Sequence, residues 1–164
     1  MRKQFNQLLV LLSHCIANRT LSIIVLTEVN IKSEEVSLYK IPGYIVFPNT
    51  REARRGGGIL VYVREDLTFT TEMPQKSLKA TELTYGKLKN GDRTTHIMAI
   101  YRPPNKNKLI FVAELEAILK KIPSSEELLL IGDVNININQ LIDTSLNAYK
   151  IMLCESGLQS AIPT

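Results

Sequence analysis

The sequence has little of what a disulfide-bonded or zinc-bound fold requires. Its 164 residues include two cysteines, Cys15 and Cys154, and two histidines, His14 and His96. Neither cysteine has a second Cys or His at ligand spacing, which excludes the usual zinc patterns. Each cysteine lies in an apolar run typical of a helix, so we expect both thiols to be buried and reduced rather than bridged. Neither histidine stands at a recognisable spacing from a residue that could be its catalytic or metal-binding partner, and we interpret both as structural.

The sequence also lacks a long hydrophobic run. No stretch approaches the roughly 18 apolar residues of a membrane span. The run Leu8–Leu12 follows basic residues but is shorter than the core of about 7–15 residues that a secretory signal needs. Repeats, low-complexity segments and linkers are absent too. We therefore expect a single intracellular domain, nuclear or cytoplasmic, that is neither secreted nor bound to a membrane.

The composition is that of an ordinary globular protein, with 45% hydrophobic and 22% charged residues. A chain of this length can bury a substantial core. The net charge is +4 and the isoelectric point about 9.1. This mild basic excess permits an anionic partner such as nucleic acid but does not require one.

The hydrophobic pattern predicts alternating helices and strands. Apolar residues recur at helical spacing in residues 3–18, 109–122 and 145–156. Compact apolar runs predict strands at residues 21–26, 59–63, 82–88, 94–101 and 128–131. Asn90-Gly91 separates two of these strands and favours a hairpin, while Pro103 ends the second one. Residues 32–50 contain turn signals and no predicted element. Together these elements favour a mixed α/β sandwich.

Polar residues follow three of the predicted strands. Glu28 follows the first, Tyr101 ends the hairpin, and Asp133 with Asn135 follows the last. Ligands gather where strands end, because the strands fix the geometry and the loops leave room. A carboxylate at the end of a buried strand has little access to water, so it needs a cation or a hydrogen-bond donor as a partner. Two neighbouring carboxylates repel each other unless a metal ion neutralises their charge. Hard oxygen ligands of this kind favour Mg²⁺ or Mn²⁺.

Each feature alone has a simpler interpretation. Glu28 could be a helix cap or a surface residue, and Tyr101 a core aromatic. The step from Gly132 to Asn135 could be an ordinary turn, since Asp and Asn bond their own backbone. The run Gly56–Gly58 is too short for a phosphate cradle and lacks the P-loop lysine, which favours a flexible turn.

The order and spacing of the motifs carry more information than any one of them. The motifs are Leu26-Thr27-Glu28, Arg55-Gly56-Gly57-Gly58-Ile59, Ile100-Tyr101-Arg102-Pro103-Pro104 and Ile131-Gly132-Asp133-Val134-Asn135. In this order they resemble the endonuclease/exonuclease/phosphatase superfamily, and specifically the endonuclease domain at the front of non-LTR (LINE-type) retrotransposon polyproteins. The triple glycine and the Tyr-Arg-Pro-Pro step are typical of that branch. The resemblance covers residues 21–164.

The resemblance implies a two-sheet α/β sandwich with mixed strands and flanking helices, and Mg²⁺-dependent (or Mn²⁺-dependent) hydrolysis of DNA. By the same resemblance, Glu28 would ligate the metal and Asp133 would orient and help deprotonate the attacking water. Asn135 would hold the scissile phosphate, and Tyr101 would contact that phosphate from the side.

Several arginines are candidates for contact with the DNA backbone. Arg51, Arg54, Arg55 and Arg64 flank the glycines, and Arg102 follows Tyr101. A solvated surface is the alternative interpretation for such a cluster. Of these, we expect Arg51, Arg54, Arg55 and Arg102 to contact DNA.

The sequence departs from the family in ways that matter for activity. It contains neither the family's first strand with its asparagine nor the later strands with their Asn/Asp residue and final Ser-Asp-His step. Val134 and Val29 replace the usual phenylalanine and threonine. We therefore expect residues 1–164 to form an incomplete sandwich that is marginally stable or self-associates through exposed sheet edges, with weak or no activity. The alternatives are a catalytically dead remnant that at most binds nucleic acid, and a phosphatase- or sphingomyelinase-like hydrolase.

Overall fold

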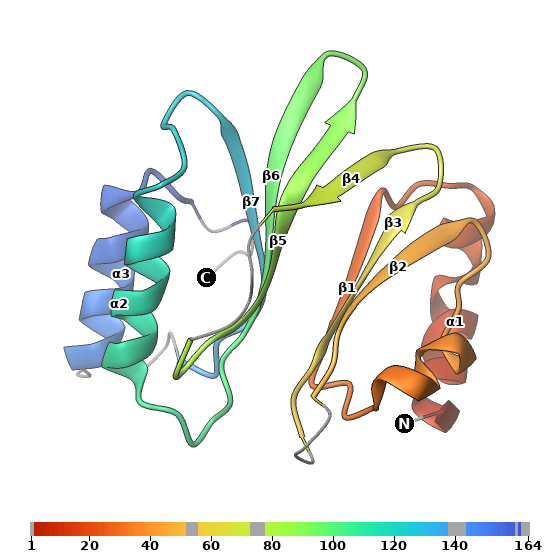
Figure 1. Ribbon diagram of the computed structural model, residues 1–164, viewed down its shortest axis with the longest axis horizontal. Helices are drawn as coiled ribbons and strands as arrows, with labels where there is room; N and C mark the ends of the chain where they lie inside the picture. The colour runs from red at the N-terminus through yellow and green to blue at the C-terminus, as the bar shows by residue number, and fades with distance from the viewer. Residues whose placement is uncertain (1, 52–55, 73–77, 138–143, 160, 162–164) are drawn as a thin grey trace.

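Two β-sheets pack face to face, and helices cover their outer faces, in a computed structural model that describes residues 2–51, 56–72, 78–137, 144–159 and 161 (Figure 1). The three-stranded sheet has the order β1-β3-β2 and the four-stranded sheet the order β4-β5-β6-β7. The strands are β1 (Ile23–Thr27), β2 (Tyr44–Asn49), β3 (Ile59–Arg64), β4 (Thr68–Thr71), β5 (Glu82–Asn90), β6 (Arg93–Tyr101) and β7 (Glu127–Asp133). The predicted two-sheet α/β sandwich is confirmed.

The helices lie on the outside of the two sheets (Figure 1). Beside the three-stranded sheet are α1 (Arg2–Ala17) and the short 3-10 helix η1 (Ser33–Leu38), and over the four-stranded sheet are α2 (Lys108–Leu119) and α3 (Thr144–Glu155). The Asn107 side chain caps α2, because its Oδ1 accepts a hydrogen bond from the amide of Ile110 at 3.1 Å. None of the described helices is both long and apolar enough to span a bilayer.

The strands β3 and β6 form the centre of the molecule, since each contributes to two cores. Their odd-numbered apolar residues face the core between the sheets, and their even-numbered ones face the outer cores under the helices. Successive side chains of a strand point to opposite faces, so an apolar residue at every position fits a strand covered on both sides. All neighbouring strands pair antiparallel except β6 and β7. These two strands are parallel, and α2 lies in the crossover between them.

Several predictions about the strands were wrong. The pattern missed β2 and β4, and one of the turn signals in residues 32–50, Pro48, lies within β2. β2 is an edge strand, where a residue without an N–H is tolerated. The compact apolar run at residues 21–26 is typical of a strand buried on both faces, but β1 is the other edge strand, and Ile24 is its one buried residue.

The two cysteines are unpaired, as predicted. Cys15 is half-buried, whereas Cys154 is exposed rather than buried. The helical spacing placed Cys154 on α3 correctly but did not show which face of that helix meets the sheet.

Candidate active site

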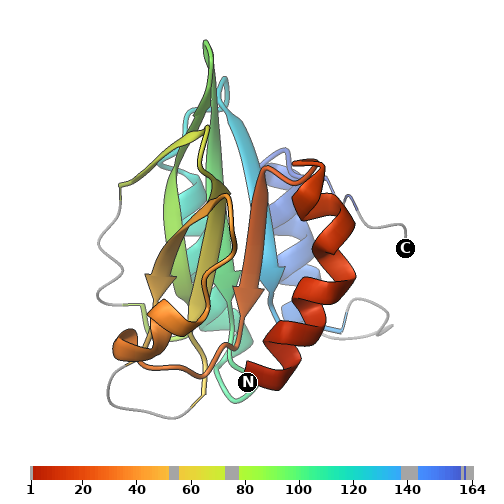
Figure 2. The same ribbon diagram turned by 90° about the vertical axis from the view of Figure 1, so that its right-hand side faces the viewer.

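The strands β1, β6 and β7 end on the same side of the sandwich, which we call the site end. Figure 2 shows β1 and β7 finishing there side by side. Tyr101 and Asp133 are the last residues of β6 and β7 and lie opposite each other in the parallel register. Glu28 follows β1 directly and has a left-handed backbone, with φ of 56°. The tyrosine hydroxyl donates a hydrogen bond to the Glu28 carboxylate. The fold therefore brings three of the predicted residues together from two sheets.

The Tyr101 hydroxyl lies among negative charges. Its side chain is 2% exposed, while Glu28 and Asp133 are exposed to solvent. Burial, the charge and hydrogen bond of Glu28, and the charges of Glu82 and Asp133 together raise the pKa of Tyr101 to about 12. At neutral pH this group is therefore a protonated hydrogen-bond donor and not a base.

The turn after β7 fixes the Asp133 carboxylate. Asp133 Oδ1 accepts a hydrogen bond from the Asn135 amide at 2.8 Å. The Asn135 side-chain Nδ2 donates to Asp133 Oδ2 at 3.2 Å and to the Arg102 carbonyl at 2.9 Å. The Asp133 carboxylate therefore accepts from both the backbone and the side chain of Asn135 at the end of β7, and these hydrogen bonds orient the predicted functional groups.

Gly132 is needed for β7 to lie this close to β6. Its φ is 149°, and an added Cβ would lie 1.8 Å from the carbonyl oxygen of Ile100. No side chain fits in that space, so glycine is required directly before Asp133.

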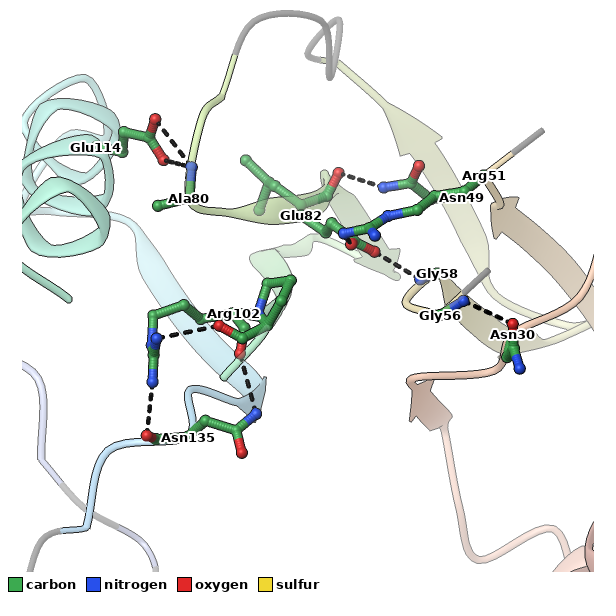
Figure 3. A network of polar contacts seen from close by, with 12 residues as sticks. Asn30, Asn49, Arg51, Gly56, Gly58, Ala80, Glu82, Arg102, Glu114 and Asn135 are labelled. Carbon is green, nitrogen blue, oxygen red and sulfur yellow. Dashed lines mark hydrogen bonds and ion pairs between the residues drawn. The ribbon is translucent and has the colours of Figure 1, made fainter. Parts of the chain in front are cut away.

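Glu82 belongs to the site, although the sequence interpretation missed it. It is the first residue of β5 and lies opposite Tyr101 in the hairpin register. Its carboxylate forms an ion pair with Arg51 and accepts a hydrogen bond from the Gly58 amide at 2.6 Å (Figure 3). Glu82 thus links the two sheets. The hairpin signal at Asn90-Gly91 sets this register and could have identified Glu82 from the sequence.

The glycine turn is closely held in place. Gly57 has a φ of 83°, and a Cβ there would lie 2.5 Å from Glu82 Oε1. The Asn30 amide donates to the Gly57 carbonyl at 2.8 Å, and Asn30 Oδ1 accepts from the Gly56 amide at 2.7 Å (Figure 3). The turn therefore fixes the segment that carries Glu28 against β5, a more specific function than that of a flexible connection.

No protein-family model and no curated protein sequence matches the chain. Its fold does match solved structures. The endonuclease domain of TRAS1, a telomere-specific non-LTR retrotransposon, aligns with a TM-score of 0.66 at 18% identity, over 93% of this chain and 68% of that one. The chain has the endonuclease/exonuclease/phosphatase fold.

Two further structures with the endonuclease/exonuclease/phosphatase fold are similar to this chain. An AP endonuclease from Archaeoglobus fulgidus has a TM-score of 0.64 at 15% identity, over 94% of this chain and 66% of that one. D. rerio TDP2, complexed with single strand DNA product, has a TM-score of 0.58 at 17% identity, over 92% and 57%. The chain thus spans between about half and two thirds of the length of these proteins.

At the site end of this endonuclease/exonuclease/phosphatase fold, the carboxylates fit a hydrated divalent cation. Within the described residues, Glu82 is neutralised by Arg51, whereas neither Glu28 nor Asp133 forms an ion pair with a lysine or arginine. Across the same part of the chain, no group of three or more His, Cys, Asp or Glu side chains could enclose a metal. Mg²⁺ keeps several waters and takes one or two carboxylates, so Glu28 and Asp133 fit this ion better than zinc.

Arg102 holds the loops of the site together. Arg102 is 1% exposed, and its guanidinium donates at 2.5–3.1 Å to the carbonyls of Pro103, Lys106, Val134 and Asn135. Figure 3 shows the contact with Asn135. Burial lowers the pKa of Arg102, and the charge of Asp133 opposes that shift. A direct contact between Arg102 and DNA, as predicted from the sequence, does not fit this burial, because the guanidinium has no free surface.

The other arginines of the basic cluster around the glycines lie in different places. Arg51 is at the site end, on Glu82. Arg64 is at the opposite end of β3, where it donates to Asp66 at 2.6 Å. Arg54 and Arg55 fall outside the described residues.

Proposed function

We propose that this chain is a Mg²⁺-dependent phosphodiester hydrolase domain, a DNA endonuclease of the non-LTR (LINE-type) retrotransposon kind. The observation that carries the proposal is the meeting of Tyr101, Glu28 and Asp133 at one point, where two carboxylates lack a cationic partner among the described residues. The names of the similar structures support it: a retrotransposon endonuclease, an AP endonuclease, and a TDP2 with a DNA product.

Each residue has a role that its surroundings support. Glu28 would hold the metal ion, and Mn²⁺ could replace Mg²⁺ because both prefer oxygen ligands. When bound, the ion supplies Lewis-acid stabilisation of charge on the phosphate. Asp133, fixed by the turn, orients the attacking water and accepts its proton. The Tyr101 hydroxyl, which donates to Glu28 in the free chain, would turn its one hydrogen bond to a phosphate oxygen when DNA is bound.

Asn135 can bind the phosphate through one of its two amide N–H groups. One N–H donates to the Arg102 carbonyl at 2.9 Å and fixes the Asn135 side chain. The other makes a longer contact of 3.2 Å with Asp133 and is the one that would turn to the phosphate. Phosphate binding would therefore also release one oxygen of Asp133.

We propose that hydrolysis by this chain is weak and that its catalytic set is incomplete. Among the described residues, no histidine lies at the site end: His96 is near the start of β6, and His14 is on α1. Asp133 would then accept the proton without a second acid or base, and groups that act as a unit lose orders of magnitude in rate when one is missing.

The deciding test is nicking of supercoiled plasmid with Mg²⁺. We expect a slow rate for the chain itself, lost in both Asp133→Ala and Glu28→Ala. Asp92→Ala and Glu34→Ala remove exposed carboxylates elsewhere and should keep the rate. Nicking that persists in the two site variants would refute the proposed site. A folded chain that binds DNA without any nicking would instead favour a catalytically dead remnant.

We also propose that the chain self-associates through its edge strands. The edges are β1 and β2 in one sheet and β4 and β7 in the other. Leu129 of β7 is 43% exposed, and an exposed apolar edge is a template for strand pairing. Gel filtration over a range of concentrations would refute this if the chain stayed monomeric throughout.

A further inference from the structure

A hollow of about 190 Å³ lies beside the candidate active site but does not include its carboxylates Glu28 and Asp133. It is formed by the end of β2, the segment leading into β5 and the loop after β6. Its polar lining residues are Asn49, Arg51, Lys79, Thr81, Glu82 and Lys106. Figure 3 shows Asn49, Arg51 and Glu82 close together, with Ala80 and Glu114 toward α2.

The charge of the hollow is opposite to that of the neighbouring site. Three cationic side chains line it, against the single carboxylate of Glu82. Arg51 pairs with that carboxylate. In the part of the chain that the structure describes, neither Lys79 nor Lys106 forms an ion pair. A polyanion lying across both regions would therefore meet lysines next to the site that suits a metal.

The backbone that carries the two lysines is held by side chains from below. Glu114 of α2 accepts hydrogen bonds from the amides of Lys79 and Ala80 and from the Thr81 hydroxyl, the last two at 3.1 and 2.7 Å. The carbonyl of Lys106 accepts from the buried Arg102 guanidinium at 2.5 Å. Both lysines thus start from a fixed position, which lowers the entropy lost on binding.

We propose that this hollow is a subsite for a backbone phosphate of the DNA strand, next to the phosphate that is cleaved. Lys79 and Lys106 bind this phosphate, with Arg51 as a third donor. Lysines that act as point charges carry no information about base sequence, so the subsite positions DNA without selecting a target. The inference rests on the proposed function, because it takes DNA to be the polyanion.

The test is binding of a short fluorescein-labelled DNA duplex in EDTA, followed by anisotropy over a range of salt concentrations. The double variant Lys79→Ala/Lys106→Ala should bind roughly tenfold more weakly. The slope of log affinity against log salt should fall in magnitude by about 1 or more, as one or two phosphate contacts are lost. The matched control is Lys3→Ala/Lys40→Ala, which removes the same charge from exposed residues outside the hollow. In this control variant, the affinity and the salt slope should change only by the small amount that follows from the lower net charge.

The outcomes separate this inference from the proposed function, because binding in EDTA needs no hydrolysis. A lower slope in the Lys79/Lys106 variant, restored by Lys79→Arg/Lys106→Arg, supports the subsite even if the chain never nicks DNA. An equal loss in the control variant, or no change in either, overturns the subsite even if nicking depends on Asp133. A chain that binds no DNA at all overturns it as well.

Discussion

Strand β6 carries a buried polar side chain at each end, and the two have opposite surroundings. His96, near its start, is 2% exposed, and both ring nitrogens have partners: the Tyr85 hydroxyl at Nδ1 and the Glu126 carboxylate at Nε2. Tyr101, at its end, is equally buried, but its hydroxyl lies among the charges of three carboxylates, those of Glu28, Glu82 and Asp133. At the start of β6, both ring nitrogens of the histidine have hydrogen-bond partners. At its end, negatively charged carboxylates surround the tyrosine hydroxyl.

The difference shows what separates a structural polar group from a functional one in this molecule. Buried polar atoms with complete hydrogen bonding stabilise a unique packing. Carboxylates gathered around a buried hydroxyl without forming an ion pair contribute little to stability until a ligand arrives, and a group with a raised pKa such as Tyr101 is typical of functional sites. The residue type alone does not distinguish the two cases, since a histidine is the structural group here and a tyrosine the candidate functional one.

The largest effect should come from Gly132→Ala at the site end. The added methyl group overlaps the Ile100 carbonyl, so β7 must move away from β6, and we expect a loss of about 4 kcal/mol or failure to fold. Gly91→Ala, in the hairpin turn at the other end, meets open space and only a left-handed φ of 60°, which costs about 1 kcal/mol. Urea unfolding of both variants gives the comparison, and similar losses would contradict this account of Gly132.

A smaller loss of stability should follow His96→Ala. The change removes a buried ring and leaves the Tyr85 hydroxyl without its partner, so we expect a loss of about 2–3 kcal/mol in urea unfolding. His14→Ala, on the exposed surface of α1, should change stability by less than about 0.5 kcal/mol. Any nicking activity per folded molecule should be the same in both variants. A specific loss of activity in His96→Ala would mean that this end of β6 also takes part in function.

The smallest effect should be a pH dependence carried by Tyr101. Its pKa is raised to about 12 from an ordinary value near 10, so above pH 10 the unfolded chain loses this proton before the folded one does. The stabilisation is complete below about pH 10 and is lost as the pH rises to about 12. Tyr101→Phe should therefore flatten the fall in unfolding free energy over that range, by about 1–2 kcal/mol. An unchanged pH profile in urea unfolding would contradict the raised pKa.

The sequence was informative where one strand or helix decides the outcome. The Asn90-Gly91 signal placed the β5–β6 hairpin, and the apolar spacing placed α1, α2 and α3 to within a few residues. β2 and β4 were missed because edge strands need only one covered face, so their patterns are short and weak. The meeting of Glu28, Tyr101 and Asp133 was expected from strand ends and was found.

What the sequence could not provide was burial. Arg102 looked like a cation available to DNA, and only the packing of the two loops shows that carbonyls surround its guanidinium. Glu82 was only the first residue of a predicted strand, and only the docking of the sheets places its carboxylate on the Gly58 amide. Both depend on residues distant in the chain, which local patterns do not contain.

The pairing of β6 also sets the order in which the molecule assembles. Its contact with β5 closes through a tight hairpin, a microsecond event, whereas its parallel contact with β7 must wait for the whole α2 crossover. Glu28 joins Tyr101 only when the second sheet docks. We therefore expect the acidic cluster to be completed among the last long-range contacts, so that a newly made chain passes through its partly folded states without a finished candidate site.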